Sequence, residues 1–155
     1  MSEKLSLEKP RVFLDASCWV AAAGSSTGGS ALILKLARAG YLQVVATKTV
    51  LREAERNIKN KMNEDALLRY YQELETTEIE MVEPPSDEDE AQWQDIVDEK
   101  DSHVLAGAYK AQADVLVSLD KRHILTEKVR KGFPQGHQLL LEGPGGCNKY
   151  PEKLI

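Results

Sequence analysis

The chain has 155 residues and a mass of 17.3 kDa, which fits one globular domain and is too short for two well-cored domains. Hydrophobic residues make up 42% and charged residues 29%, so the composition excludes a mostly disordered protein. The net charge is -5, and residues 83–101 hold nine acids and one base, so a uniformly basic nucleic-acid binder is excluded while a local cationic surface is not.

In chain order, the first half alternates strand and helix patterns. A strand at 11–15 is apolar and ends in Asp15. Thr47 is a candidate N-cap for the helix after the second strand, and the spacing of Val50, Leu51, Ala54 and Ile58 predicts its buried face. The predicted elements are a strand at 11–15, a helix at 16–23, a loop at 24–29, a helix at 30–39 stopped by Gly40, a strand at 42–46, helices from 48 through 58 and at 64–75, and a strand at 79–82.

The second half continues the alternation. The acidic run 87–90 suits the positive end of a helix that carries Trp93, Ile96 and Val97. Further predicted elements are a helix from Asp101, a buried strand within 114–120, a basic helix at 122–131, a strand at 137–141 and a Gly/Pro-rich segment at 143–146. Together they predict the α/β class, with a mainly parallel four- or five-stranded sheet and helices on both faces.

The domain and its location follow from the same patterns. We expect a single domain over 1–155, with a core at about 11–141 and terminal segments at 1–10 and 142–155. No apolar run approaches the roughly 20 residues that cross a bilayer, and the start of the chain lacks a secretory signal, so we expect a cytoplasmic protein with no membrane contact. Cys18 and Cys147 stand apart from any CxxC or Cys/His cluster, so no disulfide framework or zinc site is expected.

Four acidic residues should reach one edge of this sheet. Asp15 and Asp120 end strand patterns, and the carboxyl ends of parallel strands form the edge at which ligands bind. Glu53 follows the second strand, and Asp101 begins the helix that leads to the Asp120 strand. Crowded carboxylates resist ionisation unless they share protons or bind a cation, and oxygen-only ligands favour Mg²⁺ or Mn²⁺ over zinc. The set therefore predicts a hard divalent metal ion.

Each acid taken alone also has a structural interpretation. Asp15 can be a turn residue after its strand, and Glu53 an exposed helical charge. Asp101 can be a helix N-cap, and Asp120 can form an Asx turn. Only the set of four argues for a functional site.

Four blocks of the sequence resemble the PIN domain family. They are Val12-Phe13-Leu14-Asp15-Ala16-Ser17, Val50-Leu51-Arg52-Glu53-Ala54, residues 98–108 (DEKDSHVLAGA) and residues 113–120 (ADVLVSLD). Their order and spacing cover the chain from about residue 11 to 141, and the last two blocks are the more specific ones. The resemblance implies a three-layer α/β/α nuclease that cleaves single-stranded RNA with Mg²⁺ or Mn²⁺, often as the toxin of a VapC-type toxin–antitoxin pair.

The resemblance also assigns residues. The acidic quartet of the family falls on Asp15, Glu53, Asp101 and Asp120. Ser118 takes the place of the family's usual Thr, and Ser17 matches the polar position after the first Asp, so both are candidates to support the ligand carboxylates, or else ordinary strand and cap serines. Many relatives carry a further acid directly after the last Asp. This chain has Lys121-Arg122-His123 there, which argues against a second metal ion and for phosphate contact.

The expected chemistry is metal-assisted hydrolysis of a phosphodiester. A cation held by the carboxylates lowers the pKa of bound water and neutralises charge that develops on the phosphoryl oxygens. We expect Asp15 and Asp120 to be direct metal ligands and Asp101 to be a ligand directly or through water. Glu53 is expected to orient the attacking water.

Basic residues adjoin two of the acidic blocks. Cations dominate affinity for phosphate backbones, so we expect Arg52, Arg56, Lys121 and Arg122 to contact RNA. The alternative is that both clusters are solvated helix faces. His103 and His137 can be proton shuttles, although histidines in the core or facing solvent are commoner, and no role is assigned to them.

Partners follow from the resemblance as well. It implies an antitoxin protein and a homodimer, and the apolar Trp19, Leu32 and Leu36 offer a dimer surface or, alternatively, part of the core.

Two other functions fit the same fold. One is a non-catalytic RNA-binding scaffold, although all four acids are present. The other is an Mg-dependent phosphoacceptor signalling domain. Such a domain requires paired acids on the first strand and a Lys at the end of a late strand, whereas here the first strand ends in one Asp and the late strand ends in Asp120. A phosphatase is weaker because residue 17 is Ser in place of the second Asp, and the glycine clusters are badly placed for dinucleotide binding.

Overall fold

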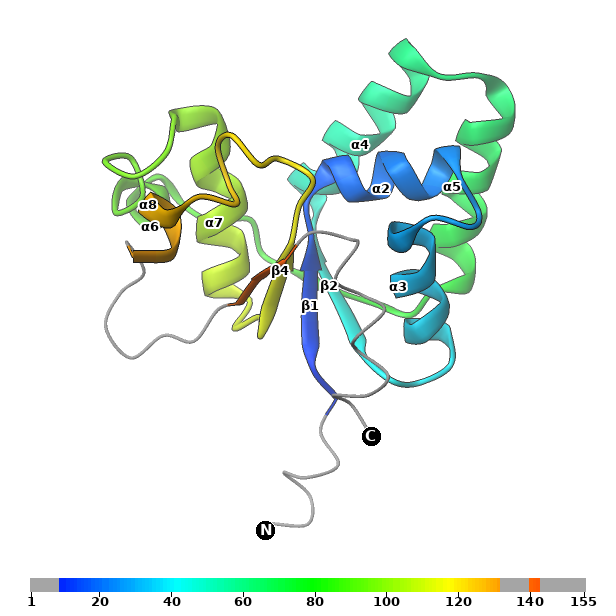
Figure 1. Cartoon of the computed structure of the whole chain (residues 1–155), viewed down its shortest axis with the longest axis horizontal. Coiled ribbons are helices and arrows are strands. Elements are labelled where there is room, and N and C mark those ends of the chain that lie inside the picture. Colours follow the sequence, from blue (N-terminus) through cyan, green and yellow to red (C-terminus); the bar gives the residue numbers. More distant parts are fainter. Residues whose placement is uncertain (1–8, 132–139, 143–155) are drawn as a thin grey trace, which may run out of the picture.

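The computed structural model describes residues 9–131 and 140–142, and this part contains one parallel sheet (Figure 1). Five strands lie in the order β3-β2-β1-β4-β5, with bounds β1 (Arg11–Leu14), β2 (Gln43–Thr47), β3 (Ile79–Val82), β4 (Val115–Val117) and β5 (Leu140–Glu142). Every pair is parallel, and the register sets Leu14 beside Val117 and Thr47 beside Val82. The carboxyl ends of the strands therefore share one edge, as predicted.

Helices cover both faces of the sheet (Figure 1). One layer holds α2 (Ala16–Gly24), α3 (Gly29–Arg38), α4 (Lys48–Lys61) and α5 (Glu64–Thr76), which pack against one another. The other layer holds α6 (Asp87–Ala91) and α7 (Glu99–Lys110), with α8 (Glu127–Lys131) beside them. This arrangement confirms the predicted α/β/α sandwich.

The core follows from the apolar pattern of the central elements. All three residues of β4 are buried, as are Val50, Ala54 and Ile58 on one face of α4. Gly107 lets α7 lie close to β1, because a Cβ at this position would meet Phe13 Cζ at 3.3 Å. The first turn of α7, which bears Asp101, lies beside the carboxyl edge of the sheet (Figure 1).

Local signals at the helix ends agree with the sequence. Thr47 caps α4, with its side-chain oxygen accepting a hydrogen bond from Val50 N at 3.3 Å. Gly40 follows α3 with φ +90°, a conformation that L side chains rarely adopt. Both predicted boundaries are confirmed.

Two predicted helices and one predicted strand are shorter than expected. The helix after the acidic run ends at Ala91, because Trp93 turns into the core and packs edge-on against Tyr109 at 6.0 Å between ring centroids. The basic helix begins at Glu127 instead of residue 122, and β4 ends at Val117, three residues before Asp120. Residues 137–139 and 143–146 of the last predicted elements lie outside the described residues.

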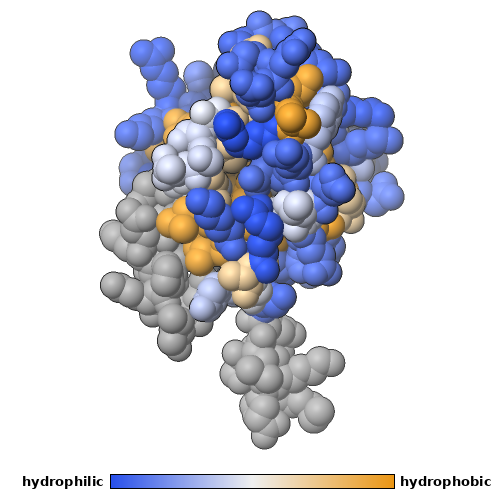
Figure 2. All heavy atoms as spheres, turned by 90° about the vertical axis from the view of Figure 1, so that its right-hand side faces the viewer, coloured by the Kyte–Doolittle hydropathy of each residue, from blue (hydrophilic) through white to orange (hydrophobic). Residues whose placement is uncertain are grey.

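The proposed dimer surface is wrong in its residues. Trp19 and Leu36 are buried and Leu32 packs against the core, so these side chains are not free to form an interface. Figure 2 shows the side covered by α3 and α5, where hydrophilic residues dominate and hydrophobic ones form separate small patches. The dimer prediction therefore rests on the family resemblance alone. Among the described residues, no helix is both long and apolar enough to cross a membrane.

Candidate active site

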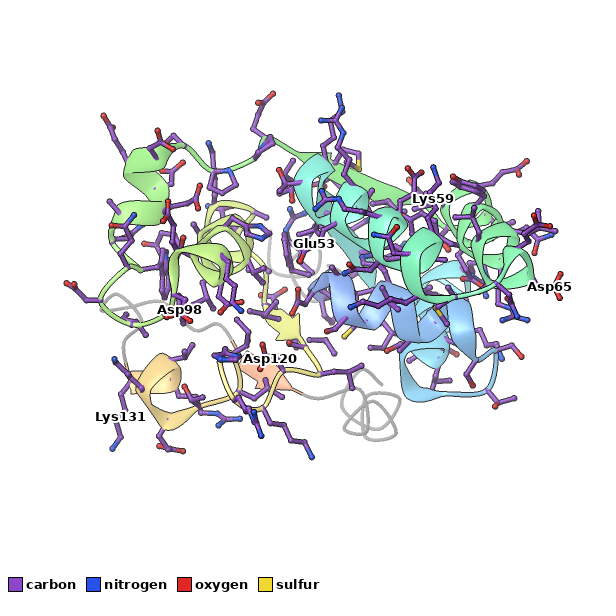
Figure 3. All side chains as sticks on the ribbon, turned by 90° about the horizontal axis from the view of Figure 1, so that it is seen from above. Glu53, Lys59, Asp65, Asp98, Asp120 and Lys131 are labelled. Carbon is purple, nitrogen blue, oxygen red and sulfur yellow. The ribbon has the colours of Figure 1, made fainter. Side chains whose placement is uncertain are left out.

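The candidate site lies at the carboxyl edge of the sheet. Asp15 directly follows β1, and its backbone N–H donates to Val117 O at 2.9 Å, which joins it to the end of β4. Figure 3 looks down on this edge and shows Glu53 on α4 and Asp120 after β4 on opposite sides of its centre. The parallel register thus brings residues from distant parts of the sequence to one place.

Asp15 is held by hydrogen bonds on both carboxylate oxygens. Oδ1 accepts from Ala16 N at 2.7 Å and caps α2, while Oδ2 accepts from Ser118 Oγ at 2.8 Å. Burial raises the pKa of Asp15 despite these bonds, and the charge of Glu53 raises it further. The carboxylate is ordered but poorly solvated, a state that a bound cation would stabilise.

The two serines named from sequence join the loop after β4 to the start of α2. Ser118 is fully buried, and its Oγ donates to Asp15 while accepting from Asp120 N at 3.0 Å. Ser17 Oγ accepts from Leu119 N at 3.2 Å. Ser118 therefore links Asp15 and Asp120 through one hydroxyl, and its role in supporting the ligands stays a prediction.

Replacing Ser118 by Ala is expected to weaken both the fold and the site. It removes the donor to Asp15 and leaves Asp120 N–H without its acceptor, which should lower the free energy of unfolding by about 1–3 kcal/mol. Ser118→Thr keeps the hydroxyl and should retain activity that Ser118→Ala loses. Thermal denaturation and RNA cleavage measure the two effects, and equal cleavage by the Ala and Thr variants would contradict the role of the hydroxyl.

Glu53 contacts a histidine from the opposite helical layer. Glu53 Oε2 lies 3.4 Å from Nε2 of His103, which comes from α7. The hydrogen bond from His103 lowers the pKa of Glu53, and the same bond raises the pKa of His103. This contact connects α4 and α7 across the carboxyl edge.

Asp101 carries a polar atom that lacks a partner. Its Oδ2 is buried and has no hydrogen bond within the described part of the chain. Burial raises the pKa of Asp101, and the charge of Asp120 adds to the effect. The N-cap of α7 is Asp98, so the alternative interpretation of Asp101 as a helix N-cap is wrong.

Asp120 organises its own loop. Its Oδ1 accepts from the backbone N–H groups of Arg122 at 3.1 Å and His123 at 2.9 Å, and His123 Nδ1 lies 3.1 Å from Oδ2. The Asx-turn interpretation is therefore confirmed as a structural role. α8 begins only at Glu127, after Thr126, whose Oγ1 accepts a hydrogen bond from Val129 N at 3.1 Å.

The four acids form neighbouring pairs. The charge of Glu53 raises the pKa of Asp15, and the charge of Asp120 raises the pKa of Asp101. Ser118 connects the first pair to the second through its bonds to Asp15 and to Asp120 N. Among the side chains that the structure describes, no three from His, Cys, Asp or Glu meet closely enough to hold a metal ion as they stand. The unpartnered Asp101 oxygen and the all-oxygen donors nevertheless fit a hard cation in chemistry.

The predicted RNA contacts flank these acids. Arg52 and Arg56 are exposed on α4, and Lys121 and Arg122 are exposed in the turn after Asp120. None of the four forms an ion pair with a described carboxylate, whereas Arg11, Arg38, Lys59 and Lys110 do. Cations that form no ion pair within the described residues therefore adjoin the acidic edge, and the charge of Arg56 helps to lower the pKa of Glu53.

Two histidines contact acids of the site in ways that the sequence patterns did not predict. His103 contacts Glu53 and His123 contacts Asp120. The i,i+3 spacing of Asp120 and His123 is a local signal that could have found one contact. The other depends on how α4 and α7 pack, which no local pattern reports.

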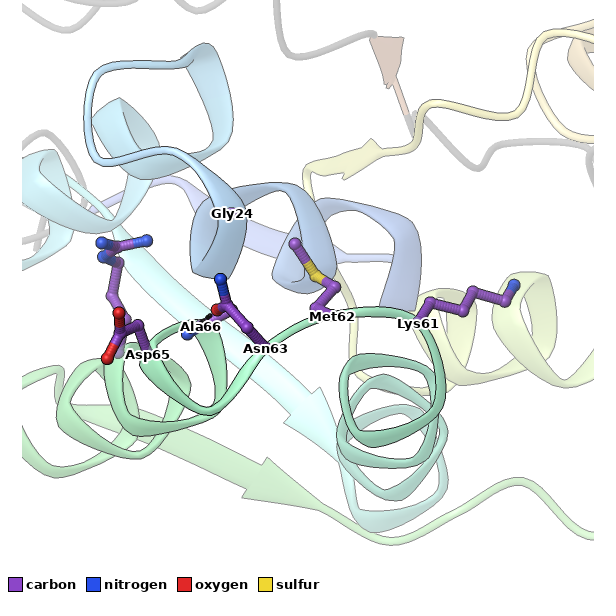
Figure 4. Close-up of a pocket in the computed structure, with 7 residues that line it drawn as sticks. Gly24, Lys61, Met62, Asn63, Asp65 and Ala66 are labelled. Atoms are coloured by element: carbon purple, nitrogen blue, oxygen red, sulfur yellow. Dashed lines mark hydrogen bonds between the residues drawn. The ribbon is translucent and has the colours of Figure 1, made fainter.

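A separate hollow of about 550 Å³ lies where the turn between α4 and α5 meets the end of α2 (Figure 4). Its lining residues are Gly24, Lys61, Met62, Asn63, Asp65, Ala66 and Arg69. It contains none of the four acids, so we do not assign it to the candidate site.

The fold and the acidic edge together define an α/β protein that gathers carboxylates at the ends of parallel strands. A sequence model of the PIN domain matches residues 11–122, and the chain belongs to the PIN domain family. PIN nucleases generally use divalent metal ions. A search among curated proteins finds no match.

Two solved structures share the fold. VapC20 of Mycobacterium tuberculosis, a toxin that cleaves the sarcin–ricin loop, matches with 15% identity and a TM-score of 0.55, covering 80% of this chain and 97% of that one. VapBC2 of Rickettsia felis, solved with a DNA fragment from its promoter, matches with 17% identity and a TM-score of 0.58, covering 86% of this chain and 98% of that one. These matches agree with the resemblance seen in the sequence.

Proposed function

We propose that the chain is a divalent-metal-dependent endoribonuclease that hydrolyses phosphodiester bonds of single-stranded RNA. The observation that carries the proposal is the buried Asp101 Oδ2, which has no partner among the described residues. The charge of a second acid, Asp120, raises the pKa of Asp101. Membership of the PIN domain family supports it. The matches to VapC structures add support for the toxin of a type II toxin–antitoxin pair, with an antitoxin as partner.

The four acids would have two different roles, metal binding and orientation of the attacking water. Asp15, Asp101 and Asp120 would hold Mg²⁺ or Mn²⁺, for which their oxygens are suitable donors. When bound, the ion supplies a water of lowered pKa and neutralises phosphoryl charge. Glu53 would orient the attacking water, and Ser118 keeps Asp15 and the backbone of Asp120 in place. Asp120 must exchange its contact with His123 Nδ1 to become a ligand.

The flanking cations would bind the RNA backbone. Arg52 and Arg56 stand on the same helix as Glu53, and Lys121 and Arg122 directly follow Asp120. A strand that contacts both groups passes over the acidic edge, which places a phosphate at the carboxylates. This contact is independent of sequence, because phosphate charge is common to all RNA.

Cleavage of a labelled single-stranded RNA in Mn²⁺ tests the proposal. We expect cutting by the wild-type protein, and a loss of roughly 100-fold or more with EDTA or with Asp101→Asn, because either change removes charge stabilisation at the phosphate. Gel analysis of end-labelled products gives the rates.

Two other results would replace the proposal. RNA binding without cutting under all conditions favours the non-catalytic scaffold. Labelling of an Asp by acetyl phosphate, without RNA binding, favours the signalling domain.

A further inference from the structure

We propose that His103 is a positioning residue that holds Glu53 in its working orientation through Nε2. The inference rests on the proposed nuclease function and adds a residue that this function does not by itself require. His103 belongs to α7 and Glu53 to α4, so the contact joins helices from the two layers of the sandwich.

The histidine is well placed to act as a fixed support. Its side chain is 18% exposed, and the neighbouring Ser102 and Val104 are buried, so packing of α7 limits where the ring can point. Ser102 Oγ also donates to Glu90 Oε1 at 3.0 Å, which ties α7 to the end of α6. A ring held in this way offers its donor in a constant position.

Only one ring nitrogen is available for the task. Nδ1 is buried and has no partner within the described residues, whereas Nε2 faces Glu53 Oε2 at 3.4 Å. The distance is longer than the usual 2.7–3.2 Å, as is common for catalytic hydrogen bonds before substrate binds. Nε2–H is therefore the donor, and Glu53 is the acceptor.

Glu53 needs such a support. Its side chain is 39% exposed and has several rotatable bonds, so without a partner it would spread over many orientations. The negative charge of Asp15 also acts on it and would push it away from the strand ends. The contact with His103 at Oε2 opposes both effects.

This arrangement predicts an effect on the rate and not on RNA binding. Groups that orient a reacting partner must hold it closely, and loss of such a supporting contact commonly costs about 10–100-fold in activity. His103 itself makes no contact with the cations that would bind RNA. We therefore expect kcat to fall while KM for RNA stays unchanged.

A matched pair of substitutions tests the inference. His103→Gln keeps an N–H near the position of Nε2, whereas His103→Asn carries its amide near the position of Nδ1 and cannot reach Glu53. We expect His103→Asn to lower kcat by about 10–100-fold and His103→Gln to retain most of it. Adding His103→Asn to Glu53→Gln should cost little more than Glu53→Gln alone, because the two residues act as one unit.

The outcomes separate this inference from the proposed function. Equal kcat values for the Gln and Asn variants, or additive losses in the double variant, overturn the positioning role while cleavage by the wild-type protein stands. Wild-type protein that cuts no RNA in Mn²⁺ overturns the proposed function instead. Melting temperatures of all variants, measured in parallel, identify any loss of rate that comes from unfolding.

Discussion

Asp15→Asn is expected to abolish RNA cleavage and to make the metal-free protein more stable. Asparagine keeps an acceptor for Ala16 N and a polar contact for Ser118, but it carries no charge into a poorly solvated place. Near neutral pH the gain should be about 1 kcal/mol, or roughly 2–4 °C in melting temperature for a chain of this size.

The pH dependence of this gain has a definite sign. Because burial raises the pKa of Asp15, the folded state binds a proton that the unfolded state has released. The free energy of unfolding of the wild-type protein therefore falls as pH rises through the folded pKa, and Asp15→Asn removes this decline. The gain should be present at pH 7 and vanish toward pH 3.

Thermal denaturation in EDTA and in Mn²⁺ measures these effects. Mn²⁺ should stabilise the wild-type protein more than Asp15→Asn, because the variant has lost a ligand. Asp95→Asn, at an exposed position, is the matched control. It should change neither the stability in EDTA nor the stabilisation by Mn²⁺. Lower stability of Asp15→Asn in EDTA at pH 7 would show that the carboxylate is favourable without a metal ion.

Removing the cations beside the acidic edge should weaken RNA binding strongly without affecting the fold. We expect the combined change of Arg52, Arg56, Lys121 and Arg122 to Ala to lower affinity by about 100-fold or more at low salt. Each phosphate contact that is lost should reduce the slope of log affinity against log salt by about 0.7 for a single strand. All four side chains are exposed, so the melting temperature should be unchanged.

Fluorescence anisotropy with a labelled RNA measures the affinity and its dependence on salt. The measurement uses the Asp101→Asn background, which prevents cutting. Lys9→Ala with Lys35→Ala is the control, because both lysines are exposed and lie away from the acidic edge. The control removes two positive charges against four, so a loss of log affinity about half as large would mean that binding follows net charge and not these positions.

The fold was predictable because its signals are local. The apolar run of β4 indicates a strand buried on both faces, and the spacing of Val50, Ala54 and Ile58 indicates the buried face of α4. Thr47 and Gly40 end elements through their own backbone chemistry. Local patterns failed at Trp93, where burial in the tertiary structure ends a helix that composition alone would extend.

The candidate site was predictable only in part. That Asp15 and Glu53 come near one another follows from the parallel strand order, since Asp15 directly follows β1 and Glu53 lies in the second turn of the helix that follows the neighbouring strand β2. The contact of Glu53 with His103 does not follow, because it depends on the distance between helices on opposite faces. An Asx turn at Asp120 is one of the two interpretations that the sequence allows, and the structure shows that turn.

The bond between Ser118 and Asp15 joins residues 103 positions apart and has a consequence for synthesis of the chain. A ribosome makes β1 early, but the partner that orients Asp15 emerges only when most of the domain has been translated. An incomplete chain therefore holds separated carboxylates, because contacts of such high sequence separation form only after the intervening loop closes. The carboxylates of the proposed site would thus come together only after β4, the last of the central strands to be made, has paired with β1.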